Sequence, residues 1–341
     1  MFYSGIDLSA RDSFICIVND DLSILLHRKL LNDLPAIASL LDPFKPSLQI
    51  VVESTFNWYW LVDGLQALGF QVCLAHTLGL SMITHAKVKT DRRDAFALAR
   101  LLRADLIPKA YIYPASSRPV RDLLRRRLKA VALRAQEYGS LRQLLLRQAI
   151  LSTSRNLIKL ADDTDLNAWF SHPLVLLSAS QQLERIELLS TQIRELEQQI
   201  LDLTGDKADY KRLLAISGIG KILALTILYE TGEISRFKDV RHFSSYCRLV
   251  PGVAQSGAVS RRGRATKQGN PYLKSAFNQA AVVAVRSYPA IKRCYQRHLQ
   301  RHRGSARKLV AYNVIAHKLA QAVYFVLKQG ADYREELLFR D

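Results

Sequence analysis

The spacing of apolar residues changes repeatedly over the first hundred positions, which predicts short strands mixed with helices. Apolar runs typical of strands occupy residues 2–8, 14–18, 23–31, 48–53 and 70–74. Helical spacing follows at 33–41, 57–68 and 77–86, and again after Asp91. The order β-β-β-α-β-α-β-α predicts an α/β domain with a mixed sheet over residues 1–112.

The strand pattern stops after about residue 110, and two long helices are expected instead. Ser116 or Ser117 starts the first, with Pro119 in its first turn, and Ser180 starts the second. The second has a heptad-like seam: Leu183, Ile186, Leu189, Ile193, Leu196, Ile200 and Leu203. We therefore predict a helical, coiled-coil region over 113–205. It forms a hairpin or a dimer, with packing inside its own chain as the alternative.

Residues 206–341 are expected to form an all-α domain that begins with a helix-hairpin-helix. The segment 213–225 reads as helix, a Gly-Ile-Gly turn, and helix. Gly218 and Gly220 would let backbone N–H groups approach a phosphate, aided by the helix N-terminus and Lys221. A purely structural turn is the alternative. A loop rich in Gly, Ser and Arg follows, and then helices at 272–285, 290–303 and 305–327.

The net charge of +19 is concentrated at the C-terminal end of the chain. Residues 1–110 contain 11 basic and 11 acidic residues, whereas residues 241–341 contain 19 and 4. No acidic residue occurs between Asp239 and Asp332. Such a stretch is typical of a surface that binds a polyanion. Nucleic acid is favoured over an anionic membrane because no basic amphipathic helix has an aromatic face to insert.

The cysteines favour a reducing compartment. Cys16, Cys73, Cys247 and Cys294 are scattered, with no CxxC pair, which argues against disulfides and a zinc finger. We expect a cytoplasmic protein, associated with the nucleoid when active, because no signal peptide or membrane span is apparent. Cys294, His298 and His302 follow one another along a single helix, but three ligands over about 11 Å are too far apart for one ion.

Four carboxylates form the strongest candidate for chemistry. Asp7 and Glu53 each end an apolar strand, and Asp91 and Asp94 open a helix. Four acids on one edge of a sheet would repel one another unless cations bind, and such oxygen ligands suit Mg²⁺ or Mn²⁺. Two ions could clamp the oxygens of a phosphodiester during displacement. The alternatives are ordinary helix capping and separate salt bridges to Arg11, Arg92 or Arg93.

These residues resemble the DEDD signature of the RuvC-like transposases of bacterial insertion sequences. The resemblance rests on Gly5-Ile-Asp7, Val52-Glu53-Ser54-Thr55 and Thr90-Asp91-Arg-Arg-Asp94-Ala95. It implies an RNase H/RuvC-like fold for the N-terminal domain. It also implies that Asp7, Glu53, Asp91 and Asp94 bind metal, with Arg92 and Arg93 placed to approach phosphate.

The loop supplies the second half of the resemblance. Its chemistry alone does not single out Ser256, because no His or Lys at fixed spacing marks it as activated. However, Ser256-Gly257, followed by Gly263, Lys267, Gly269 and Leu273-Lys274, is similar to the family's C-terminal motif, which makes Ser256 the candidate nucleophile. Ser260 is the fallback. Arg248 stands where the family tends to have glycine. Further nucleic-acid contacts are expected from Arg261, Arg262, Arg264, Lys267 and Lys274.

Three functions follow from these patterns. The first is a DNA transposase or site-specific recombinase that uses metal-bound carboxylates and Ser256. The resemblance also implies an element-encoded guide RNA, and the helical region a dimer or tetramer. The second is a metal-dependent nuclease or junction resolvase that uses water. The third is a non-catalytic nucleic-acid-binding scaffold.

Overall fold

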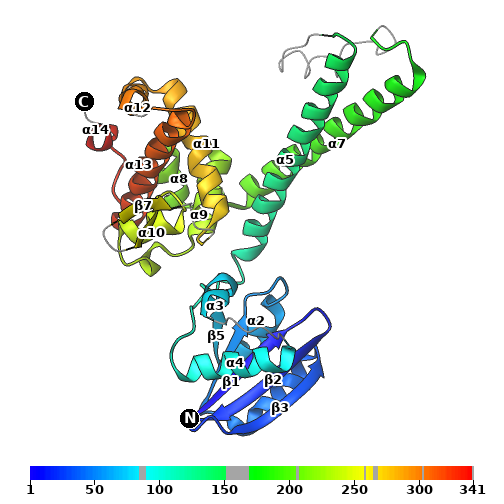
Figure 1. The fold of residues 1–341 in the computed structure, drawn as a ribbon, viewed down its shortest axis with the longest axis vertical. Helices are drawn as coiled ribbons and strands as arrows, with labels where there is room; N and C mark the ends of the chain where they lie inside the picture. The colour runs from blue at the N-terminus through cyan, green and yellow to red at the C-terminus, as the bar shows by residue number, and fades with distance from the viewer. Residues whose placement is uncertain are drawn as a thin grey trace. The chain divides into compact units, whose positions relative to one another are not determined.

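The computed structural model describes residues 1–83, 90–150, 169–204, 207–256, 259–263, 268–301 and 303–339, with only the backbone for 252–256 and 259–263. The chain divides into two compact units, residues 1–115 and 116–341 (Figure 1). Arg264 and Lys267, two of the expected nucleic-acid contacts, lie outside the described residues, as does His302. Each unit is described by itself below.

Unit 1 is built on a five-stranded mixed sheet, as predicted. Its strands are β1 (Phe2–Leu8), β2 (Asp12–Asn19), β3 (Ile24–Leu31), β4 (Leu48–Glu53) and β5 (Gln71–Ala75). Their order across the sheet is β3-β2-β1-β4-β5. The first three strands form an antiparallel meander, and β1, β4 and β5 run parallel to one another. The parallel strands have the continuous apolar runs expected of strands buried on both faces.

Helices cover both faces of this sheet. On one face, α1 (Leu34–Leu41) and α2 (Tyr59–Ala67) bury the cluster that includes Ile6, Ile50 and Leu61. On the other face, α4 (Asp91–Arg103) packs on β1, β2 and β4 (Figure 1). A 3-10 turn (Asp42–Phe44) and α3 (Thr77–Ile83) complete the unit.

Unit 2 begins with a helical hairpin of α5 (Arg118–Arg147) and α7 (Pro173–Thr204). The two helices are antiparallel, because Arg127 pairs with Glu197 whereas Glu137, further along α5, pairs with Arg185. The expected start of the second helix at Ser180 is wrong: α7 begins at Pro173, where proline fits a first helical turn. Ile186, Ile193 and Ile200 of the predicted seam are buried, so this half of the seam packs inside its own chain.

The rest of unit 2 is a helical assembly around one core. Its helices are α8 (Ala208–Leu214), α9 (Lys221–Thr231), α10 (Val240–Tyr246), α11 (Pro271–Ser287), α12 (Pro289–Arg301), α13 (Arg307–Gln329) and α14 (Glu335–Leu338), with a 3-10 turn at Ile234–Arg236. The prediction of an all-α domain is wrong in one respect. β6 (Gly252–Ser256) and β7 (Val259–Gly263) form an antiparallel ribbon, although their sequence is too polar to show an alternating apolar pattern.

The longest helix of this assembly, α13, is apolar and long enough to cross a membrane by composition alone. No such span was expected from the sequence. Half of its most apolar window is buried inside the protein, and Ile315, Leu319 and Val323 are fully buried in the core of unit 2. α13 is therefore explained as the central helix of this core.

Candidate functional site

Asp7 and Glu53 lie at the carboxyl ends of neighbouring parallel strands. β1 and β4 are paired in register up to Ile6 and Val52, so each acid is the next residue of its strand. Both carboxylate side chains belong to half-buried residues. The sheet therefore places these two acids side by side at one edge, as the strand-end pattern predicted.

The two acids also share one face of the sheet, the face that α4 covers. Val51 packs with Leu98 of α4, and Gly5 lies so close to α4 that a Cβ there would approach Leu98 Cβ to 2.8 Å. Residues two apart in a strand point to the same face. Glu53, two after Val51, and Asp7, two after Gly5, are therefore both directed to the α4 side.

The direction of α4 brings its first turn to the same edge. Near the start of α4, the Arg92 carbonyl contacts His27, whose strand partner Cys16 pairs with Gly5. Near its end, Leu101 and Leu102 lie in one packed cluster with Tyr3. The helix thus runs opposite to β1 and begins at the end of the sheet that carries Asp7. This orientation was not predictable from the chain pattern alone.

The first turn of α4 holds the other two carboxylates. The N-cap is Thr90, whose hydroxyl accepts a hydrogen bond from the Arg93 N–H at 3.4 Å. Asp91 is thus the first helical residue, exposed, and Asp94 is half-buried one turn later. Acidic residues are favourable in a first turn because of the helix dipole, so both residues suit this position.

The backbone thus places the strand ends that carry Asp7 and Glu53, and the first turn of α4 that carries Asp91 and Asp94, at the same end of one face of the sheet. This donor set, four carboxylates from three elements, fits the oxygen ligands that Mg²⁺ or Mn²⁺ takes. Within the described ranges, however, no group of three or more His, Cys, Asp or Glu side chains forms a metal-holding cluster. The backbone elements that carry the acids lie at one end of the sheet, but the acidic side chains do not form a single metal-coordinating group.

Arg92, expected to approach phosphate, contacts the edge of the sheet. Its Nε donates to His27 Nδ1 at 3.2 Å, and its carbonyl oxygen lies 3.0 Å from His27 Nε2. Burial lowers the pKa of His27, and the Arg92 charge also lowers it, so the ring is neutral at pH 7 and can accept from the guanidinium. Arg93 is exposed beside it. Both arginines are exposed, and Arg92 is the one whose side chain is hydrogen-bonded to His27.

The α8–α9 turn contains the expected glycines in different environments. Gly218 is buried with a φ of +86°, and a Cβ there would meet the Ala280 carbonyl at 2.4 Å. Its need for glycine is explained by the backbone angle and by packing against α11. Gly220 and Lys221 are exposed, and a Cβ on Gly220 would meet nothing within 4 Å. The exposed end of the turn is thus its α9 side.

The ribbon carries the candidate nucleophile. Ser256 is the last residue of β6 and pairs with Val259; Arg261 and Arg262 lie on β7. Ser260, the fallback, pairs with Gln255. Lys274 lies in the first turn of α11 and is half-buried. The ribbon and the carboxylates belong to separate units.

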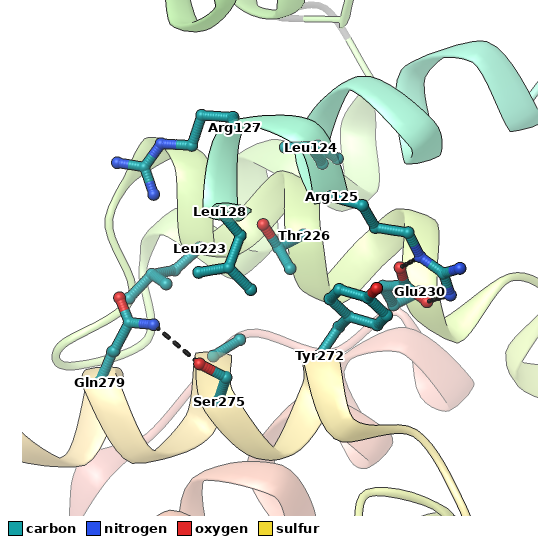
Figure 2. A pocket seen from close by; sticks show the side chains of 11 residues that line it. Leu124, Arg125, Arg127, Leu128, Leu223, Thr226, Glu230, Tyr272, Ser275 and Gln279 are labelled. Atoms are coloured by element: carbon teal, nitrogen blue, oxygen red, sulfur yellow. Dashed lines mark hydrogen bonds and ion pairs between the residues drawn. The ribbon is translucent and has the colours of Figure 1, made fainter. Parts of the chain in front are cut away.

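A buried ionic cluster in unit 2 was not predicted from the sequence; Figure 2 shows two of its members, Arg125 and Glu230. Glu230 on α9 is 1% exposed at its side chain. Arg121 Nε donates to it at 3.1 Å and Arg125 Nη2 at 2.9 Å, both from α5. Burial by itself would raise the pKa of Glu230, but the two arginines and Asn270 outweigh it and hold the pKa below its usual range. A single acid inside the apolar run of α9 was the available signal.

Two family models match this chain. The DEDD transposase model of the IS110 type covers residues 4–149, which contain the four carboxylates. The model of the IS116/IS110/IS902 transposase family covers residues 210–296, which contain the α8–α9 turn and the ribbon. The two matches are consecutive and together span most of the chain.

Curated relatives agree with these models. A family 20 transposase of Pseudomonas aeruginosa is 27% identical over 302 residues, which is 85% of this chain and 86% of that protein. Transposase y4qE of Sinorhizobium fredii is 29% identical over 201 residues, 57% of this chain and 48% of the relative. The transposase of insertion element IS1328 of Yersinia enterocolitica is 28% identical over 146 residues, 42% of each. This chain thus spans about half of y4qE and most of the Pseudomonas protein.

Proposed function

Because this chain belongs to the DEDD transposase family of insertion sequences, we propose that it cuts and rejoins DNA at the ends of such an element. The proposal is supported by the position of Asp7 and Glu53 at the ends of neighbouring strands and of Asp91 and Asp94 in the first turn of the helix that packs on the same sheet. Carboxylates at neighbouring strand ends and in the first turn of a helix on the same face form an oxygen-rich donor set of the kind that divalent cations take. A shared role in holding cations explains their position, and an RNase H/RuvC-like fold is the architecture we assign to unit 1.

The chemistry we assign to the site is phosphodiester transesterification. The four carboxylates would hold two Mg²⁺ or Mn²⁺ ions, which supply charge stabilisation for the attacking and leaving oxygens. Ser256 Oγ attacks the scissile phosphorus: the Oγ–P bond forms, the P–O bond to one deoxyribose breaks, and the serine proton ends on the released hydroxyl. Attack by a hydroxyl of a second strand reverses the step and joins the new ends.

Ser256 and the carboxylates come from different parts of the chain, so the proposal requires the two to act on one phosphate. We propose that they meet either within one subunit or between subunits of an oligomer. The helical hairpin supports the second arrangement. Leu189, Leu196 and Leu203 of the predicted seam, with Leu133 of α5, line a groove of about 660 Å³. A second copy of the hairpin is the occupant that we propose, because the buried isoleucines already use the other half of the seam.

Nucleic-acid binding is assigned to the basic C-terminal part of the chain. The exposed residues Gly220 and Lys221 are the N-cap and the first residue of α9, and backbone N–H groups at a helix N-terminus favour phosphate. Arg261 and Arg262 lie on the ribbon next to Ser256. Arg293, Arg301 and Arg303 extend the positive charge to α12 and beyond. The family resemblance also supports an element-encoded RNA as a second partner that pairs with donor and target DNA.

The experiment purifies the chain with its flanking element transcript and assays recombination of the element ends, with and without RNA and with Mg²⁺ or chelator. Asp7→Asn and Asp91→Asn should abolish the Mg²⁺-dependent reaction. Asp105→Asn is the matched control, because that carboxylate is 87% exposed and belongs to the same unit. Full activity in the Asp7 and Asp91 variants would support a non-catalytic scaffold and reject the proposal.

Ser256→Ala separates the recombinase from a nuclease that uses water. The recombinase should lose both the covalent protein–DNA adduct and strand exchange. A nuclease should keep cutting. Ser260→Ala, on the opposite strand of the ribbon, tests the fallback nucleophile in the same assay.

A further inference from the structure

The segment that carries Ser256 is a loop closed at its base. It leaves α10 after Tyr246 and returns at Asn270, whose N–H donates to the Tyr246 carbonyl oxygen at 2.6 Å. Gly269, with φ +91°, allows this approach, because a Cβ there would meet the Tyr246 carbonyl at 2.5 Å. The two ends of the loop are thus fastened to each other, and the ribbon projects from that base.

Asn270 is the residue through which this base is oriented. Its Oδ1 accepts from the N–H groups of Tyr272 and Leu273, at 2.9 and 3.1 Å, and so caps α11. Backbone N–H groups only donate, so the side-chain oxygen must face them and the NH₂ group must point the other way. That group donates to Glu230 Oε2 at 2.7 Å. Asn270 is 5% exposed, so its orientation is fixed from all sides.

Glu230 is itself held by α5. Two arginines of that helix, Arg121 and Arg125, donate to its carboxylate. The Arg125 guanidinium also lies 4.2 Å from the centre of the Tyr272 ring, on the first turn of α11 (Figure 2). A chain of contacts therefore runs from α5 through Glu230 to Asn270, the base of the loop.

We propose that Glu230 is a positioning residue that directs the Ser256 ribbon through Asn270. A buried ion cluster is a weak device for stability alone, since apolar side chains of similar volume often do as well. Its hydrogen bonds, however, are directional and fix one rotamer at the loop base. The role of Glu230 in positioning Ser256 for reaction rests on the proposed function. The ordering of the loop base by Glu230 follows from the contacts alone.

Two variants test the link without removing the helix cap. Asn270→Ser keeps an oxygen that can cap α11 but has no amide to donate to Glu230. Glu230→Gln keeps the shape of the side chain and removes the charge that holds the arginines. Gln279→Ala is the matched control. It removes the hydrogen bond to Ser275 on α11, in the pocket that Glu230 and Tyr272 also line (Figure 2), away from the loop base.

Three measurements on the full chain are needed: hydrogen exchange of residues 247–269, the single-turnover rate of adduct formation at saturating DNA, and DNA affinity. In Asn270→Ser we expect exchange to be faster by about tenfold and the adduct rate to fall by about tenfold or more, as expected for a misplaced reacting group. DNA affinity should fall by less than the adduct rate, because the proposed contacts of Arg261 and Arg262 belong to the ribbon whereas those of Gly220 and Lys221 lie outside it. The double variant should be no slower than Glu230→Gln alone.

Wild-type exchange over 247–269 in both variants would overturn the proposal. Faster exchange with a wild-type adduct rate would overturn the positioning role and leave Glu230 as a structural group. An equal loss in Gln279→Ala would also overturn it, because the effect would then be general to the pocket. If wild-type protein forms no adduct at all, the proposed function fails, while the exchange measurement still decides whether Glu230 orders the loop.

Discussion

Replacing Gly5 by alanine would add a methyl group that overlaps backbone atoms of α4. The added Cβ would lie 2.6 Å from the Ala99 nitrogen and 2.8 Å from Leu98 Cβ, and closer still to the Ala95 carbonyl oxygen. Two of these three atoms are backbone, so no side-chain rotation relieves the contact. The whole helix must move away from the sheet.

The size of the effect follows from these distances. Ordinary contact between heavy atoms requires roughly 3.5 Å, so α4 must shift by about 1 Å. Overpacking of this kind costs about 1–3 kcal/mol. The same shift carries Asp91 and Asp94 away from Asp7 and Glu53, and a 1 Å misplacement of a reacting group can cost about a hundredfold in rate. We therefore expect a larger loss of activity than of stability.

Urea unfolding and the Mg²⁺-dependent recombination assay measure the two effects on the same preparations. Gly139→Ala is the matched control, because Gly139 is exposed on α5 and an added Cβ would meet nothing within 4 Å. Alanine there should stabilise the protein by about 0.5–1 kcal/mol. A Gly5→Ala protein with wild-type unfolding midpoint and wild-type activity would refute the close packing of α4 on β1 and the geometry of the site built on it.

Other predictions follow from single contacts. Gly218→Ala should destabilise unit 2 by about 2 kcal/mol or more, whereas Gly220→Ala should unfold as wild type and weaken nucleic-acid binding in a filter assay; equal stability of the two would contradict the observed packing. Thr90→Ala should cost about 0.5–1 kcal/mol in urea unfolding, and Thr90→Ser should restore it. Burial lowers the pKa values of His27 and His317, so the unfolded state binds more protons. Stability should thus be complete above about pH 6.5 and fall below it; an unfolding midpoint independent of pH between 5 and 7 would exclude this.

Much of the fold was predictable because local pattern and tertiary packing agree. The strand that ends on Glu53 and the strand that carries Asp7 as its last residue but one are apolar runs with clear boundaries, and both form as expected. The start of α7 was missed because the residues after Pro173 are apolar without a clear period. The ribbon of β6 and β7 was missed because its pairing is made by backbone hydrogen bonds between polar residues.

The sequence proposes a set of residues for the candidate site, whose role stays a prediction, and it does not give their geometry. Strand ends and a helix start identify four acids, but the direction of α4 depends on Gly5, a contact that no spacing reveals. The contact of Arg92 with His27 joins residues 65 positions apart. The same holds for Glu230, whose arginine partners lie more than 100 positions away.

The docking of α4 on Gly5 also links the order in which the chain is synthesised to its proposed activity. Asp7 belongs to the first strand to be synthesised, whereas Asp91 and Asp94 arrive only with the helix that covers the sheet. A nascent or truncated chain that ends before residue 91 has half of the carboxylates and an uncovered apolar face, which invites proteolysis. The docking of α4 therefore covers the sheet and completes the proposed cutting site in the same step. Fragments that lack α4 are expected not to cut DNA.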